Sequence, residues 1–121
     1  MATLADVIPV LMVRDIGRAV AFYRTLGFRL LGQDDDRDPR YARVQRDQAR
    51  LHLQWHDAVE WTHPYNRPCY RFAVDDVDAL WHATGLTPGP DAKAPADQPW
   101  GLREAHVRDP DGNVLMFYEG S

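Results

Sequence analysis

The sequence lacks the features that would mark a disulfide-rich, membrane or nucleic-acid-binding protein. It has a single cysteine, so no disulfide can form within the chain, and this suits the reducing cytoplasm, where we expect the protein to act. The apolar run at residues 7–13 is too short to cross a bilayer, and no basic segment typical of a signal peptide precedes it. Lysine and arginine are not clustered and the net charge is −4, which argues against nucleic acid as a partner.

The chain does have enough apolar residues for one core. Its 121 residues are 45% hydrophobic and 26% charged, as in an ordinary globular protein. This length suits one domain and is too short for two. We therefore expect a single domain over residues 1–121.

The order of predicted elements repeats once. A strand at 7–13 precedes a helix that Asp15 caps and Gly27 ends, and strands follow at 29–33, 41–46 and 50–55. The pattern restarts with a strand at 69–74, a helix from 77 that Asp75 or Asp76 caps and Gly85 ends, and strands at 104–108 and 113–118. Residues 86–99 contain several prolines and carry no strand signal, so we expect a loop there. The sequence thus predicts an α+β domain of two similar modules.

The alternation of side chains along the strands predicts two unlike faces for each sheet. Leu51 and Leu53 point one way and His52 the other, and Leu115 and Phe117 likewise oppose Met116. The first face is apolar enough to take a helix. The second mixes polar and apolar side chains, as a ligand cavity requires.

The paired modules, the helices that open on Val-x-Asp and the final turn Asp-Pro-Asp-Gly-Asn resemble the vicinal oxygen chelate superfamily. That group includes glyoxalase I, ring-cleaving dioxygenases and bleomycin-resistance proteins, and the resemblance covers about residues 8–119. It implies two paired βαβββ modules, at about 6–60 and 67–119, with mixed sheets curled around a concave pocket and helices on the outer face. Because one fold hosts many chemistries, it places the pocket better than it names the ligand.

Enzymes of this superfamily hold a divalent metal with four side chains, and the resemblance places those positions at Ile8, His52, Cys69 and Met116. Isoleucine has no lone pair, and methionine is a soft ligand that does not suit the usual oxygen-preferring metals. His56 cannot replace a missing ligand beside His52, because four residues along a strand span ~13 Å. We therefore expect no metal and no cofactor, and Cys69 and Met116 are expected to pack in the cavity wall.

The bleomycin-resistance branch gives the nearest local matches. These are Ile-Pro-Val-Leu-Met-Val-Arg-Asp at 8–15, Tyr41-Ala42, Asn66, and the segment 98–113 with its Pro-Trp-Gly, Arg-Glu and Asp-Pro-Asp-Gly-Asn motifs. The resemblance implies a homodimer that sequesters a cationic antibiotic, with Trp100 and Tyr41 clasping its flat ring system. The acidic run at 34–38 would attract the cationic tail at long range. The expected ligand-binding residues are Trp100, Tyr41, His52, Asn66, Cys69, Arg71 and Met116.

Other interpretations stay open at this point. The protein could be an enzyme of the same superfamily that uses His52, with His106 or Cys69, as a general base on a small metabolite. It could also be a ligand sensor or a structural dimer with a vestigial pocket. Trp100 could pack on its own core or in a dimer interface, and Tyr41 could be an ordinary edge-strand aromatic.

Overall fold

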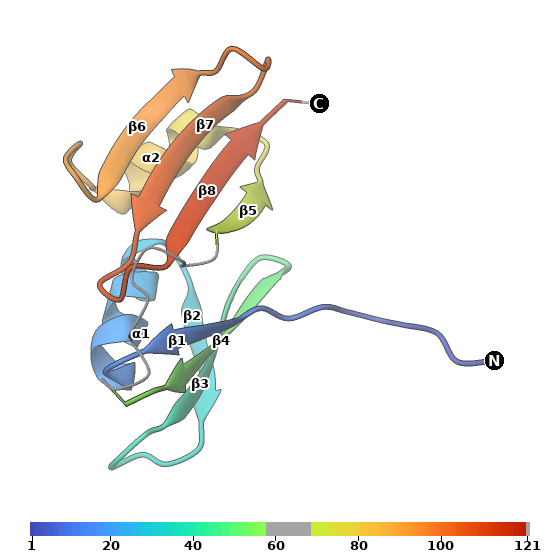
Figure 1. Ribbon diagram of the computed structural model, residues 1–121, viewed down its shortest axis with the longest axis vertical. Helices are drawn as coiled ribbons and strands as arrows, with labels where there is room; N and C mark the ends of the chain where they lie inside the picture. The colour runs from blue at the N-terminus through green and yellow to red at the C-terminus, as the bar shows by residue number, and fades with distance from the viewer. Residues whose placement is uncertain (58–68, 121) are drawn as a thin grey trace.

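The repeat predicted from the sequence is present in the structure, a computed structural model that describes residues 1–57 and 69–120. Module one contains one helix and four strands, and module two repeats that set (Figure 1). The elements of module one are β1 Val10–Val13, α1 Ile16–Thr25, β2 Arg29–Gln33, β3 Tyr41–Arg46 and β4 Ala49–Trp55. Those of module two are β5 Cys69–Ala73, α2 Val77–Thr84, β6 Ala92–Asp97, β7 Arg103–Arg108 and β8 Val114–Glu119.

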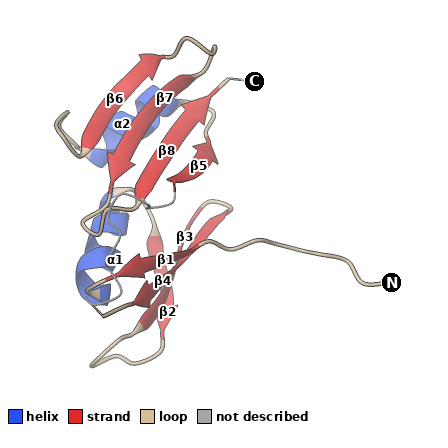
Figure 2. Cartoon of the chain, viewed as in Figure 1, coloured by secondary structure: helices blue, strands red, loops and turns tan. Residues whose placement is uncertain are grey.

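Each module forms its own mixed sheet of four strands. The strand order is β1-β4-β3-β2 in module one and β5-β8-β7-β6 in module two. In both sheets the first strand of the module runs parallel to the last, and the remaining pairs are antiparallel. α2 lies behind the sheet of module two, and α1 lies beside that of module one (Figure 2). The α+β class and the paired βαβββ architecture are therefore confirmed.

Both helices begin at an aspartate, as the sequence predicts. The Asp15 carboxylate accepts a hydrogen bond from the Arg18 backbone N–H at 2.9 Å, and Asp76 accepts one from Ala79 at 3.0 Å. These bonds satisfy backbone donors that have no partner within the first helical turn. Gly85 ends α2 in the left-handed conformation, with φ of 68°.

The face of each sheet that meets a helix supplies the core. In module one, Leu51 and Leu53 are fully buried, and in module two Leu115 is, as the alternation predicts. Phe28 of module one meets Phe72 of module two edge-on, with ring centroids 6.3 Å apart. The modules therefore share some apolar contact, although each sheet packs mainly on its own helix.

The sequence interpretation was wrong about two segments. Residues 92–97 were expected to be loop but form β6, whose proline, Pro95, lies at an irregular step in the pairing with β7. Proline cannot donate to a ladder, yet an edge strand tolerates it, and β6 is an edge. β1 begins at Val10 and not at residue 7, and Val7 is 93% exposed.

The turn at 109–113 joins module two to module one through buried polar groups. The Asp109 carboxylate accepts hydrogen bonds from the Asp111 and Asn113 backbone N–H groups at 2.9 and 2.8 Å. It also accepts from the Tyr23 hydroxyl of α1 at 2.7 Å and from the Asn113 amide at 2.9 Å. Burial raises the pKa of Asp109, and burial together with this carboxylate raises the pKa of Tyr23 strongly.

Further bonds extend this junction to the start of α1 and the end of β1. The Asn113 side-chain amide donates to the Met12 carbonyl oxygen at 3.0 Å, and Asp111 Oδ1 accepts from Arg18 Nη2 at 3.0 Å. Because Asp109 and Asn113 are 4% and 2% exposed, these bonds are shielded from water. The Asp-Pro-Asp-Gly-Asn motif thus fixes how the two modules sit against each other.

The N-terminal residues lie apart from both sheets. Residues 1–7 are exposed and extend away from the two modules (Figure 1). Within the described residues, no helix is long and apolar enough to cross a membrane.

Candidate functional site

Each sheet leaves one face without a helix, and we call these the open faces. Residues are assigned to them by strand register and by alternation with the buried positions. The open face of module one carries Val10, Met12, Arg29, Gly32, Tyr41, Arg43, Gln45, Arg50, His52 and Gln54. That of module two carries Cys69, Arg71, Ala73, Lys93, Ala96, Glu104, His106, Arg108, Val114, Met116 and Tyr118.

Tyr41 and His52 form a pair on the open face of module one. The Tyr41 hydroxyl lies 2.6 Å from His52 Nδ1, and the rings meet edge-on at 5.2 Å. Burial, together with the charges of Arg43 and Arg50, lowers the pKa of His52. The neutral ring accepts at Nδ1 from the Tyr41 hydroxyl when its proton is on Nε2. The pair is therefore a fixed, uncharged unit between two cations.

The carboxylate of Glu104 is the centre of the open face of module two. Its side chain is fully buried, and Oε1 accepts from Arg71 Nη2 at 3.0 Å and from Trp100 Nε1 at 3.1 Å. Oε2 lies 3.0 Å from His106 Nε2. The hydrogen bond from His106, then those from Trp100 and Arg71, hold the pKa of Glu104 below its usual range. Sequence reasoning did not include Glu104 among the site residues, although the Arg-Glu pair after Pro-Trp-Gly was a signal for it.

Trp100 is held by its edge while its ring stays accessible. The residue is 61% exposed, so it is not part of its own chain's core. The loop around it is closed by hydrogen bonds from the Gln98 N–H to the Leu102 carbonyl and from the Gly101 N–H to the Gln98 carbonyl. Gly101 has φ of 93°, which other residues rarely adopt. The bond to Glu104 leaves the ring faces free for stacking.

The other predicted residues of module two surround Glu104. The Arg71 guanidinium lies 4.6 Å above the Tyr118 ring centroid and 3.8 Å from the Met116 sulfur. Cys69 as a residue is exposed, but its thiol is partly shielded from water, which raises the pKa of the thiol, so it is not an activated nucleophile. Asn66 lies outside the described residues.

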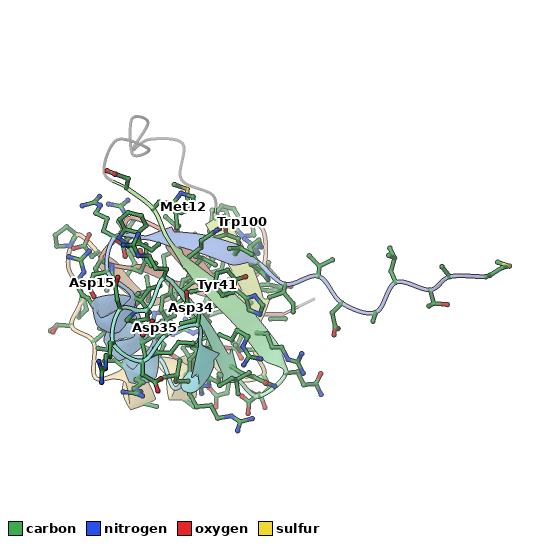
Figure 3. All side chains as sticks on the ribbon, turned by 90° about the horizontal axis from the view of Figure 1, so that it is seen from below. Met12, Asp15, Asp34, Asp35, Tyr41 and Trp100 are labelled. Carbon is green, nitrogen blue, oxygen red and sulfur yellow. The ribbon has the colours of Figure 1, made fainter. Side chains whose placement is uncertain are left out.

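A single chain does not bring Tyr41 and Trp100 together. Trp100 is in the loop between β6 and β7, at one end of the long axis of the molecule, and Tyr41 follows the loop between β2 and β3, at the other end (Figure 1). Figure 3 looks along that axis, which is why the two labels lie close together in this view. His52 is likewise in module one, whereas Cys69 and His106 are in module two.

The acidic loop shapes the chain ahead of Tyr41. Asp34 Oδ1 accepts from the Arg40 and Tyr41 backbone N–H groups at 2.9 and 3.1 Å, and Asp35 Oδ1 accepts from Arg37 at 2.8 Å. The hydrogen bond from the Arg40 backbone is the main cause that lowers the pKa of Asp34. These two carboxylates therefore have partners in their own loop. Figure 3 labels Asp34 and Asp35 of this loop and Tyr41 at the start of β3.

Two further observations concern metals and cavities. Within residues 1–57 and 69–120, no three His, Cys, Asp or Glu side chains group closely enough to hold a metal ion. A cleft of about 670 Å³ lies between the modules, bounded by the β3–β4 turn, β5 and the start of α2. Among the predicted site residues that the structure describes, Arg71 alone lines it, beside Ala73 of the same open face. The cleft thus meets the open face of module two at β5, but its lining does not include Tyr41, His52 or Trp100.

Comparison with known proteins gives a family and a fold. The family described as the Glyoxalase/Bleomycin resistance protein/Dioxygenase superfamily matches residues 5–117. No curated protein sequence matches the chain significantly.

Among solved structures, a bleomycin resistance determinant encoded on the transposon Tn5 superposes with a TM-score of 0.81 at 24% identity, over 98% of this chain and 99% of the other. A bleomycin-binding protein complexed with bleomycin gives 0.78 at 24% identity, over 98% and 100%. The bleomycin-binding protein of the bleomycin producer Streptomyces verticillus, complexed with copper(II)-bleomycin, gives 0.76 at 29% identity, over 100% of both chains. At such identities the first two likenesses show the fold alone.

Proposed function

The chain belongs to the Glyoxalase/Bleomycin resistance protein/Dioxygenase superfamily, and from this premise we propose that it is a cytoplasmic binding protein that sequesters a flat aromatic small molecule of the bleomycin type. Binding requires no metal held by the protein and no chemical step. The proposal agrees with structural relatives that are bleomycin-binding proteins.

The observation that carries the proposal is the geometry of Trp100. A large apolar ring that is 61% exposed is held in place at 3.1 Å by the fully buried carboxylate of Glu104. Such a ring is already positioned before a ligand arrives, so binding need not order it. Offset stacking on an aromatic face contributes about 0.5–1.5 kcal/mol beyond the buried area. A stacking platform for a planar ligand is the use that this arrangement supports best.

We propose further that the complete pocket needs two copies of the chain. Tyr41 and Trp100 lie at opposite ends of the molecule, and no helix of the described residues covers either open face. A two-fold axis would set module one of one chain against module two of the other. Tyr41 of one chain would then lie opposite the β6–β7 loop of the partner chain, which carries Trp100. Symmetry then creates two equivalent pockets.

Dimerisation can be tested by sedimentation or small-angle scattering. At micromolar concentration we expect a particle of about twice the chain mass of 13.9 kDa. A clean monomer would contradict the two-chain pocket, because Tyr41 and Trp100 of a single chain lie too far apart to contact the same ligand.

The function itself is tested by calorimetric titration of metal-free bleomycin into protein treated with a chelator. We expect saturable binding with about one ligand per chain, because the symmetric pair has one pocket for each Trp100. Treatment with chelator should not change the affinity, since the proposed contacts are stacking and hydrogen bonds. A divalent ion held at one per chain by the purified protein before any ligand is added would contradict metal independence, whereas an ion that arrives bound to bleomycin would not.

A further inference from the structure

The open faces carry mainly basic side chains, although the net charge of the whole chain is negative. The chain carries 18 acidic and 14 basic residues, a net charge of −4. On the strands of module one, however, the open face holds Arg29, Arg43 and Arg50, and its described strand residues include no carboxylate. The open face of module two holds Arg71, Lys93 and Arg108 against a single carboxylate.

That single carboxylate is already neutralised. Glu104 accepts hydrogen bonds from both Arg71 and Trp100 and contacts His106, and its side chain is fully buried, so it is not presented to a cationic ligand. In the 34–38 loop, Asp34 and Asp35 accept from the backbone of their own loop, and Asp38 pairs with Arg40. Nothing among the described strand residues of either open face is arranged to receive a positive charge.

Arg43 and Arg50, by contrast, have no acidic partner among the described residues. Among the described residues, neither guanidinium makes a side-chain hydrogen bond or an ion pair, and Arg43 lies directly opposite His52 in the β3–β4 register. Both are close enough to His52 for their charges to disfavour its protonation. Two cations without counter-charges beside an aromatic pair are an electrostatic cost to the free protein, and an anion would relieve it.

Gly32 leaves the space that the Arg43 side chain occupies. The two residues are partners in the β2–β3 register, and a Cβ added at Gly32 would lie 2.6 Å from Arg43 Nη2. The end of the Arg43 side chain therefore occupies the space that a side chain at residue 32 would need. Any side chain at that position would displace it.

From this arrangement we propose that the ligand of the open faces carries an anionic group, a carboxylate, sulfonate or phosphate on its planar ring, and that Arg43 and Arg50 bind that group. The inference rests on the proposed function, because the ring itself stacks on Trp100. It replaces the cationic ligand expected from the acidic loop. Within the class of the proposed function it therefore favours planar compounds that carry an anionic group, and a cationic bleomycin would bind by ring stacking without this contact.

The test compares two probes that share one ring and differ in charge, naphthalene-2-carboxylate and naphthalen-2-ylmethylammonium, by calorimetry at low ionic strength. We expect the carboxylate to bind at least about tenfold more tightly, the equivalent of one charge-assisted hydrogen bond. Added salt should reduce this ratio, because these arginines are exposed. Equal binding of the two probes, or tighter binding of the ammonium, would overturn the inference.

Variants assign the selectivity to particular side chains. In the double variant Arg43→Gln/Arg50→Gln, the ratio of the affinity for the carboxylate probe to that for the ammonium probe should fall towards one. Arg24→Gln, which removes an exposed arginine of α1, away from the open faces, should leave it unchanged. Gly32→Ala keeps every charge but displaces the Arg43 guanidinium, so it should lower the ratio less than the double arginine variant does. An unchanged ratio in both arginine and glycine variants would contradict the assignment.

Failure of the proposed function gives a different result. If neither probe binds, or if Trp100→Ala leaves both affinities unchanged, the stacking platform is wrong and this inference falls with it. If both probes bind and both need Trp100, but without the charge preference, only the inference is overturned.

Discussion

Replacing Asp109 with alanine is expected to lower the free energy of unfolding by about 3–4 kcal/mol. The carboxylate accepts four hydrogen bonds in a buried site, and two of them come from side chains, the Tyr23 hydroxyl and the Asn113 amide. Each buried donor left without a partner costs about 1–3 kcal/mol. Removing the carboxylate also removes the cost of burying it, which keeps the total below the sum of these terms. Urea or thermal unfolding of the two proteins measures the difference.

A matched control is Asp91→Ala. Its carboxylate lies 3.9 Å from Arg108 Nη1, and both side chains are exposed. Exposed pairs of this kind contribute about 0–1 kcal/mol, so this variant should unfold almost as wild type does. If Asp109→Ala also unfolds like wild type, the polar turn is not what joins the modules, and the contact between Phe28 and Phe72 would have to do so.

Replacing Trp100 with alanine is expected to weaken ligand binding about five- to a hundredfold, or ~1–3 kcal/mol, the range found when stacking platforms for planar rings are removed. The same change should cost little stability, because the residue is 61% exposed. Calorimetry with bleomycin and thermal melts of both proteins separate the two effects.

Trp81 provides the contrast within the same chain. It is 8% exposed on the buried side of α2, and loss of a core tryptophan costs about 3–5 kcal/mol of stability. We expect Trp81→Ala to melt much lower than Trp100→Ala and, while folded, to bind as wild type does. If Trp100→Ala binds normally and melts far lower, the residue is structural and the site assignment is wrong.

Much of the fold could be predicted because its signals are local. Asp15 and Gly85 mark helix ends by hydrogen bonding and by backbone conformation, and neither depends on distant residues. The alternation in β4 and β8 directly identifies the faces that become buried. The repeated order of these signals was enough to indicate two modules and the superfamily to which the chain belongs.

The rest depends on contacts between distant parts of the chain. β6 contains Pro95, a residue that argues against a strand unless that strand is known to lie at an edge. The position of Glu104 beside Arg71 follows from the β5-β8-β7 order, which the sequence does not display. The separation of Tyr41 from Trp100 follows from how the modules are joined. Site residues proposed singly from motifs therefore could not be assembled into one site.

Within residues 1–57 and 69–120, no strand of one sheet pairs with a strand of the other. The polar turn at 109–113 carries much of the connection between the modules. Mutations on one open face therefore need no compensating change in the other sheet. Each open face can be altered by mutation separately from the other. New ligand specificities can then arise by altering a single half while the other keeps what it already recognises.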